Sequence, residues 1–138
     1  MGSSKLTMKT RRFDHIDLRV KDMAAAQKFY GQLLPALGFS VASGDDELRT
    51  YQRPGEGPEE FFCFEEGTDH QPNETRIAFW AESRAEVDRL TEIVRGAGGL
   101  KLEGPEVCLE YSPGYYAVFF EDPSGNKLEI CCRESRPS

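Results

Sequence analysis

An internal repeat constrains the fold of this chain more than any other feature. The segment that begins at His15, HIDLRVKDMAAAQKFYGQLLPALG, aligns with the segment that begins at Arg76, RIAFWAESRAEVDRLTEIVRGAGG, at a constant offset of 61 residues. Each copy predicts a strand, a helix and a closing glycine, and three short extended segments follow each helix. These segments lie near residues 40–43, 48–53 and 60–65, and near residues 100–111, 115–121 and 127–133. The sequence therefore predicts one βαβββ unit twice.

Both predicted helices carry start and stop signals. Asp22 caps the first helix and Gly38 closes it, whereas Ser83 caps the second, with Glu86 completing a capping box, and Gly98 closes it. The strands before the helices alternate apolar and polar residues, as half-buried strands do. We therefore expect an α+β fold in which each helix covers one face of its sheet and the two open faces form a curved cup.

The predicted domain covers residues 11–134, with one module at 11–67 and the other at 75–134. Residues 1–10 are expected to be a disordered leader or a remnant of cloning. A chain of 138 residues with 38% hydrophobic and 30% charged residues is long enough for one compact core. Four cysteines without Cys-x-x-Cys spacing are expected to be small strand residues and not a disulfide framework.

Charge and hydropathy exclude several classes of partner. The net charge is -7 at pH 7, and lysines and arginines do not cluster as a nucleic-acid surface requires. No apolar run approaches the roughly 20 residues of a membrane span, and the first residues lack the apolar core of a signal peptide. We therefore expect a cytoplasmic protein that binds a small molecule and neither nucleic acid nor membrane.

Strand alternation identifies the side chains expected to line the cup. Glu129 stands between Leu128 and Ile130, so the carboxylate occupies the face opposite to two apolar residues. The same reasoning directs further side chains away from the helices: His15, Asp17, Arg76 and Trp80. Asp17 either orients the imidazole of His15 or points to solvent.

Aromatic residues are candidates for a wall of the cup. Tyr115 and Tyr116 are adjacent in a strand and must point to opposite faces, and the sequence leaves open which one meets the ligand. Phe62 and Trp80 are candidates for the same wall, with a role in the core as the alternative for each.

The two ends of the repeat carry a family resemblance. On a doubled βαβββ unit, the opening HIDLRVKD and the closing FFEDPSGNKLEI resemble the vicinal oxygen chelate superfamily, which includes glyoxalase I, fosfomycin and bleomycin resistance proteins and extradiol dioxygenases. The motifs are most similar to those of glyoxalase I. The resemblance implies Zn, Ni, Mn or Fe held by one residue from the first and one from the last strand of each half. It also implies a homodimer, with each cup formed within one chain or across two.

His15 and Glu129 match two of these four metal positions, and the other two depart from the pattern. Arg76 stands at one of them, and an arginine has no lone pair to offer a metal. At the other metal position, in the last strand of the first half, the sequence has Phe62 or Cys63 where a metal site would need Glu or His. Our main expectation is therefore no metal, with Arg76 paired to Glu129 in its place, either to bind a substrate anion or only to close a defunct site. A divalent metal on His15 and Glu129 is the alternative.

Several functions are compatible with this site. The first is a glyoxalase-like lyase or isomerase in which Glu129, His15 and Arg76 catalyse proton transfer next to a carbonyl. The second is sequestration of a small molecule without chemistry, as in bleomycin resistance proteins, for which the acidic balance favours a cationic guest. The third is a metal-dependent dioxygenase or lyase with unusual ligands. A module with a structural or regulated role is also compatible with the sequence.

Overall fold

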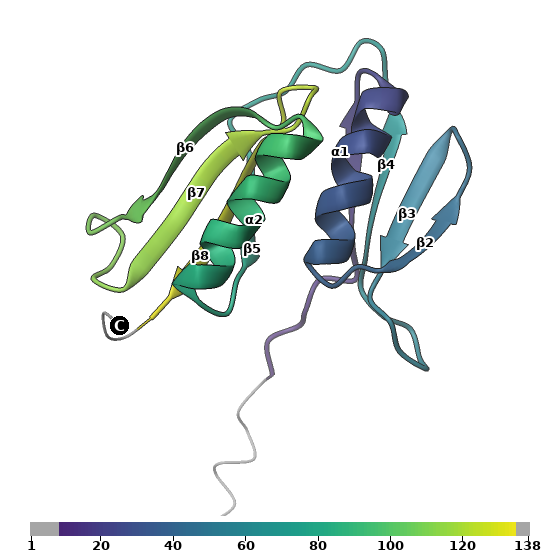
Figure 1. Cartoon of the computed structure of the whole chain (residues 1–138). Coiled ribbons are helices and arrows are strands. Elements are labelled where there is room, and N and C mark those ends of the chain that lie inside the picture. The colour runs from purple at the N-terminus through teal and green to yellow at the C-terminus, as the bar shows by residue number, and fades with distance from the viewer. Residues whose placement is uncertain (1–8, 135–138) are drawn as a thin grey trace, which may run out of the picture.

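The computed structural model describes residues 9–134 (Figure 1). Residues 1–8 of the predicted leader lie outside this range. The elements follow in the order β1 (His15–Val20), α1 (Met23–Ala36), β2 (Val41–Gly44), β3 (Leu48–Gln52), β4 (Phe61–Glu66), β5 (Arg76–Trp80), α2 (Arg84–Ala97), β6 (Leu100–Val107), β7 (Tyr115–Glu121) and β8 (Lys127–Arg133). The predicted α+β fold of two βαβββ units is confirmed. Neither helix of the described chain is long and apolar enough to cross a membrane.

Each unit forms its own four-stranded mixed sheet. The strand orders are β1-β4-β3-β2 and β5-β8-β7-β6, with β1 parallel to β4 and β5 parallel to β8. The remaining pairs are antiparallel. The last strand of each unit therefore lies beside its first strand, and this arrangement brings residues far apart in the sequence into register.

The N-caps form as the sequence indicates, except that the carboxylate of Glu86 accepts from the backbone N–H of Glu82 and not from that of Ser83, as a capping box would require. The side chain of Asp22 accepts a hydrogen bond from the backbone N–H of Ala25, and that of Ser83 accepts one from the N–H of Glu86. Gly98 ends α2 with a φ of +104°, in the left-handed region that costs other residues strain. These contacts fix where each helix begins and ends, and hence how it lies on its sheet.

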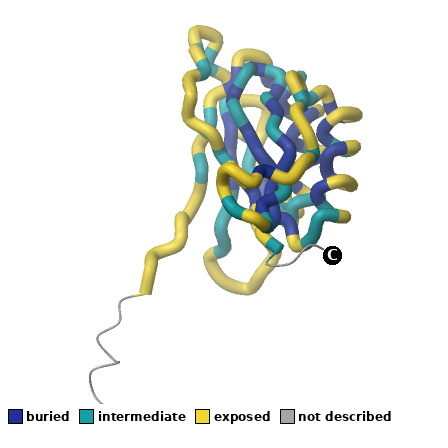
Figure 2. Tube along the Cα trace, turned by 90° about the vertical axis from the view of Figure 1, so that its left-hand side faces the viewer, coloured by how far each residue is buried: buried dark blue, intermediate teal, exposed yellow. Residues whose placement is uncertain are grey.

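The two halves share one hydrophobic core. Helices α1 and α2 lie side by side on the same side of the molecule (Figure 1), and buried residues gather between helices and sheets (Figure 2). The Phe29 ring in α1 lies 6.2 Å from that of Phe120 in β7, and the Phe62 ring in β4 lies 6.0 Å from that of Phe79 in β5. Each sheet is thus covered by a helix on one face. We call its other face the open face.

The turn between β7 and β8 joins the second half to the first. Asp122 is fully buried and accepts hydrogen bonds from the Tyr30 hydroxyl of α1 at 2.6 Å and from the backbone N–H groups of Ser124 and Asn126. The Ser124 hydroxyl in turn accepts from the N–H of Lys21 at 2.8 Å. Part of the closing motif therefore has a structural role that the sequence analysis did not anticipate.

Candidate functional site

Glu129 is a buried carboxylate on the open face of the second sheet. In the middle of β8 it lies opposite Ala78 of β5 and Phe119 of β7, and it is only 6% exposed. Its Oε2 accepts a short hydrogen bond from the Tyr115 hydroxyl. Among residues 9–134, no basic side chain forms an ion pair with Glu129. In the described chain, this carboxyl group is thus held by a hydrogen bond from a neutral hydroxyl and not by an ion pair.

Tyr115 holds the carboxylate from within a small buried cluster. It packs with Cys108, Ala117 and Cys131, a group separate from the main core. Burial, followed by the neighbouring Cys131 and Glu129, raises the pKa of Tyr115 above its ordinary value. The phenol therefore stays protonated at neutral pH and acts as a donor toward Glu129.

The structure answers which of the two adjacent tyrosines faces the open side. Tyr116 points the other way, where its hydroxyl donates to Asp88 of α2 at 2.7 Å and its ring meets the Arg84 guanidinium. The hydrogen bond to Asp88, together with burial, raises the pKa of Tyr116 to about 12. Tyr116 thus anchors α2 to its sheet, and only Tyr115 reaches the open face.

Two guanidinium groups flank Glu129 on aromatic rings. Arg76 lies 4.9 Å from the ring centroid of Phe119, which is the residue opposite Glu129 in β7. Arg133 lies 4.6 Å from the ring centroid of Tyr115 and 5.8 Å from that of Trp80. The expected pairing of Arg76 with Glu129 is not formed, because Arg76 lies in register with Lys127, two residues before Glu129.

The surroundings of Arg76 are acidic. It lines a depression of about 240 Å³ together with Phe119 and three glutamates of the β6 region, which are Glu103, Glu106 and Glu110. None of these carboxylates lies within ion-pair distance of Arg76 in the described chain. The open face of the second sheet therefore presents one positive group within a negative rim.

His15 belongs to different surroundings from Glu129. Its Nδ1 lies 2.7 Å from Oδ1 of Asp14, and its ring stacks on Phe61 at 4.6 Å. Asp17 does not contact His15: it accepts from Arg19 at 2.6 Å, and Arg19 also pairs with Glu65 at 2.9 Å. The residue that orients the imidazole is therefore Asp14, which precedes the strand.

His15, Phe62 and Trp80 come together in a separate hollow. It lies where β1 and β4 of the first sheet approach β5 of the second, and we call it the seam pocket. Its volume is about 470 Å³. Asp17 lines a third hollow with Arg19 and His70. None of these three hollows contains His15, Arg76 and Glu129 together. The structure thus distributes the predicted site residues over three hollows, and Glu129 lines none of the three.

Comparison with known proteins places the chain in a family. The family model described as "Glyoxalase/Bleomycin resistance protein/Dioxygenase superfamily" matches residues 12–130. The chain belongs to this superfamily. Uncharacterized protein YqjT of Bacillus subtilis (strain 168) is 33% identical over 128 residues, which cover 84% of this chain and 94% of that protein.

Solved structures of the superfamily share the fold. A glyoxalase/bleomycin resistance protein from Albidiferax ferrireducens T118 matches with a TM-score of 0.70 and 25% identity, over 88% of this chain and 98% of that one. The fosfomycin resistance protein FosX from Mesorhizobium loti matches with a TM-score of 0.67 and 14% identity, over 92% and 96% of the two chains. The second likeness shows the fold alone.

The residues at the four positions that the superfamily resemblance assigns to a metal do not fit a transition ion. Asp17 and Ala78 are equivalent positions of the repeat. Asp17 lies in strand register with Cys63, and Ala78 lies in strand register with Glu129, so Cys63 is the counterpart of Glu129 on the open face of the first sheet. Burial raises the pKa of Cys63 to about 11, and the thiol is protonated at neutral pH. Arg76 cannot ligate. Within residues 9–134, no three His, Cys, Asp or Glu side chains gather as a metal site would require.

Phe62 is the other residue weighed for that position, and it points away from the open face. It is 1% exposed and its ring lies 5.3 Å from that of Tyr30 in α1. Its edge also lines the seam pocket. Phe62 is therefore mainly a core residue, in agreement with the alternative that strand alternation left open.

Two residues of these sites were missed by the sequence analysis. Arg133 lies four positions after Glu129 in one strand, so the alternation that identified Glu129 also places Arg133 on the open face. Asp14 gave no such signal, because it precedes the first residue of β1 and has no strand periodicity to place it.

Proposed function

We propose that this protein is a glyoxalase-like enzyme that moves a proton next to a carbonyl group of a small molecule, with Glu129 as the group that takes and returns the proton. The observation that supports the proposal is the burial of Glu129 without a cationic partner in the described chain. A buried carboxylate costs several kcal/mol unless it is paired, so folds seldom keep one without a use. Such groups concentrate at functional sites.

The hydrogen bond to Tyr115 leaves one oxygen of Glu129 for the substrate. Only Oε2 accepts from the phenol. In the proposed reaction, the other oxygen removes a proton from the carbon next to the carbonyl, and the electrons of that C–H bond move into an enolate. The proton of the neighbouring hydroxyl passes to the former carbonyl oxygen, and the carboxyl group returns the carbon-bound proton to the former carbonyl carbon, which completes the isomerisation of an α-hydroxy carbonyl compound.

Arg76 is the group proposed to stabilise the enolate. Its guanidinium lies over Phe119, the direct neighbour of Glu129 across the sheet. A substrate bound beside the Arg76 guanidinium and the edge of that ring would have its carbonyl near the cation and its acidic carbon near the carboxylate. A positive group placed where charge develops is usually the largest single contribution to catalysis. The Tyr115 hydroxyl would hold Glu129 in place during transfer.

We propose that this chemistry needs no resident metal, since the donor set described above does not fit one. We also propose a cytoplasmic homodimer, which the superfamily relationship supports, with a small molecule as its only other partner. Sedimentation velocity tests the dimer directly. A mass equal to one chain across the micromolar range would contradict it.

Binding without chemistry is a second candidate. It is favoured by the two guanidinium groups on aromatic rings, Arg76 and Arg133, because neither has a carboxylate partner in the described chain although acidic residues outnumber basic ones 24 to 17. Cations left unpaired in an acidic protein suit recognition of an anionic ligand. This local pattern opposes the cationic guest that the net charge alone suggests.

One experiment separates the two candidates. Protein freed of metal by chelation is incubated in D2O with hydroxy ketones, hydroxy aldehydes and hemithioacetals, and proton NMR follows loss of the C–H signal next to the carbonyl. Exchange in the wild-type protein and its loss in Glu129→Gln would support the enzyme. The control is Glu92→Gln, an exposed glutamate of α2. Calorimetric binding without exchange would support the second candidate, and neither binding nor exchange would count against both.

A further inference from the structure

The seam pocket has the size and lining of a ligand site. Its volume of about 470 Å³ falls within the range of small-molecule pockets, roughly 300 to 1,000 Å³. Six aromatic residues from four parts of the chain line it: Phe13, Phe39, Phe61, Phe62, Phe79 and Trp80. This hollow contains neither Glu129 nor Tyr115, so its use does not follow from the proposed function.

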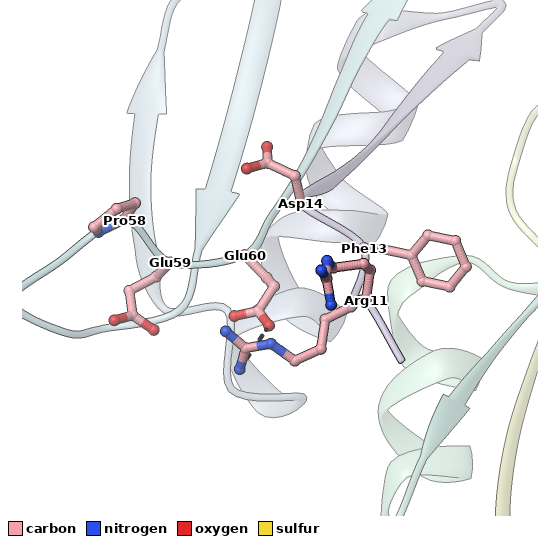
Figure 3. Close-up of a pocket in the computed structure, with 7 residues that line it drawn as sticks. Arg11, Phe13, Asp14, Pro58, Glu59 and Glu60 are labelled. Atoms are coloured by element: carbon pink, nitrogen blue, oxygen red, sulfur yellow. Dashed lines mark ion pairs between the residues drawn. The ribbon is translucent and has the colours of Figure 1, made fainter. Parts of the chain in front are cut away.

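The two most exposed aromatic side chains of the described chain lie at this pocket. Phe13 is 85% exposed and Trp80 is 71% exposed. Folding gains almost nothing from aromatic rings left in water, and neighbouring exposed aromatics mark places where something binds. Phe13 belongs to the segment that precedes β1, and its ring points away from Glu59 and Glu60 (Figure 3). A planar ligand would cover both rings.

The rim of the pocket carries a surplus of positive charge in an acidic protein. Three arginines line it against two carboxylates: Arg11, Arg12 and Arg53, with Asp14 and Glu60. Arg12 and Arg53 both pair with Glu60, at 3.2 and 2.8 Å. Arg11 has no carboxylate partner among residues 9–134 and donates to the carbonyl of Lys9. One guanidinium therefore remains available for an anion.

From these observations we propose that the seam pocket binds a planar apolar molecule that carries one anionic group, such as an aromatic carboxylate. The ring system stacks between Phe13 and Trp80, and the anion is held by the Arg11 guanidinium at the rim. Arginine pairs with carboxylate and sulfonate groups in charge-assisted hydrogen bonds. The inference goes beyond the proposed function, because the pocket binds its ligand independently of Glu129.

Two dyes test the proposal. 8-Anilinonaphthalene-1-sulfonate has an apolar ring system with one anion, and N-phenyl-1-naphthylamine has the same rings without the sulfonate. Trp80 is the single tryptophan of the chain, so energy transfer from tryptophan to a bound dye reports on this pocket. We expect the anionic dye to bind at one site per chain with energy transfer from Trp80, and about two- to fivefold more tightly than the neutral dye.

Exposed positions supply variants that leave the fold intact. Phe13→Ala is expected to weaken binding of both dyes by about two- to tenfold, because a stacking ring is lost. Arg11→Gln is expected to weaken only the anionic dye, by about two- to fivefold. Matched controls are Leu109→Ala and Arg95→Gln, which remove an exposed apolar side chain and an exposed arginine elsewhere. Both controls should bind the dyes as the wild-type protein does.

Several results would overturn the proposal. Equal affinity for the two dyes, absence of energy transfer from Trp80, or unchanged binding in Phe13→Ala would each refute it. Trp80 emission that shifts with protein concentration without dye would show instead that a second copy of the chain covers the pocket. Glu129→Gln should keep full dye binding, so failure of the proposed enzyme activity and failure of this site are distinguishable.

Discussion

Replacing Tyr30 with Phe removes the hydrogen bond that ties α1 to the buried turn after β7. The hydroxyl donates to Oδ2 of Asp122 at 2.6 Å, and both residues are fully buried. A hydrogen bond to a charged group is worth about 1.5–3 kcal/mol. The side-chain amide of Asn126 still donates to the same oxygen at 2.9 Å, so the carboxylate is not orphaned. We therefore expect Tyr30→Phe to lower the free energy of unfolding by about 1.5–2 kcal/mol at pH 7.

The pH dependence gives this prediction its sign. Burial, with Asp122 beside it, raises the pKa of Tyr30 well above its ordinary value. A group with a raised folded pKa contributes stability that is complete below the unfolded pKa, about 10 for tyrosine, and is lost as pH rises further. The wild-type protein should therefore lose about 1.4 kcal/mol per pH unit above pH 10 that the variant does not lose. The difference in the free energy of unfolding between the wild-type protein and Tyr30→Phe should therefore narrow as pH rises above 10.

Urea unfolding followed by far-ultraviolet circular dichroism at pH 7, 9 and 11 measures the difference. The contributions of Tyr115 and Tyr116 are common to both proteins and cancel. Tyr51→Phe is the matched control, because Tyr51 is 9% exposed and its hydroxyl has no hydrogen-bond partner in the described chain. It should change stability by less than about 1 kcal/mol. A gap below about 0.5 kcal/mol at pH 7, or one that stays constant to pH 11, would refute the reasoning.

Three further predictions follow from single contacts. Ser83→Ala removes the cap of α2 and should cost about 1 kcal/mol in urea unfolding, and no loss would contradict the cap seen at Glu86. Gly44→Ala should lower the free energy of unfolding by about 1–3 kcal/mol, because φ is +95° and a Cβ would overlap the carbonyl oxygen of Leu48. Gly57→Ala, with open space around the Cβ, should leave stability unchanged. Alkylation of Cys63 by iodoacetamide, followed by mass spectrometry, should be slow at pH 7.5 and rise about tenfold per pH unit toward pH 11, and rapid labelling at pH 7.5 would contradict the raised pKa.

The fold was predictable because its signals are local and repeated. The cap residues Asp22 and Ser83 and the glycine Gly98 each act within one turn of helix, so the sequence shows them directly. Strand alternation likewise placed Glu129 on the open face of its sheet. The repeat at offset 61 then supplied the topology.

The site was less predictable because it depends on register between strands. The sequence places Arg76 and Glu129 on one face of the sheet. It does not show that Arg76 of β5 lies in register with Lys127 of β8, nor that its guanidinium lies over the ring of Phe119. The partner of Tyr30 is 92 residues away in the sequence, and no local pattern connects it with Asp122. Contacts of this kind require the three-dimensional arrangement of both halves.

The most direct test of the proposed function is the rate of carbon-bound proton exchange in chelated protein, compared between the wild-type chain and Glu129→Gln. General acid–base catalysis contributes about 10²- to 10⁴-fold. We predict that the wild-type protein keeps its rate with less than one metal ion per ten chains, and that Glu129→Gln loses at least about a hundredfold. A rate that appears only after Zn, Ni, Mn or Fe is added, or one that survives in Glu129→Gln, would contradict the account.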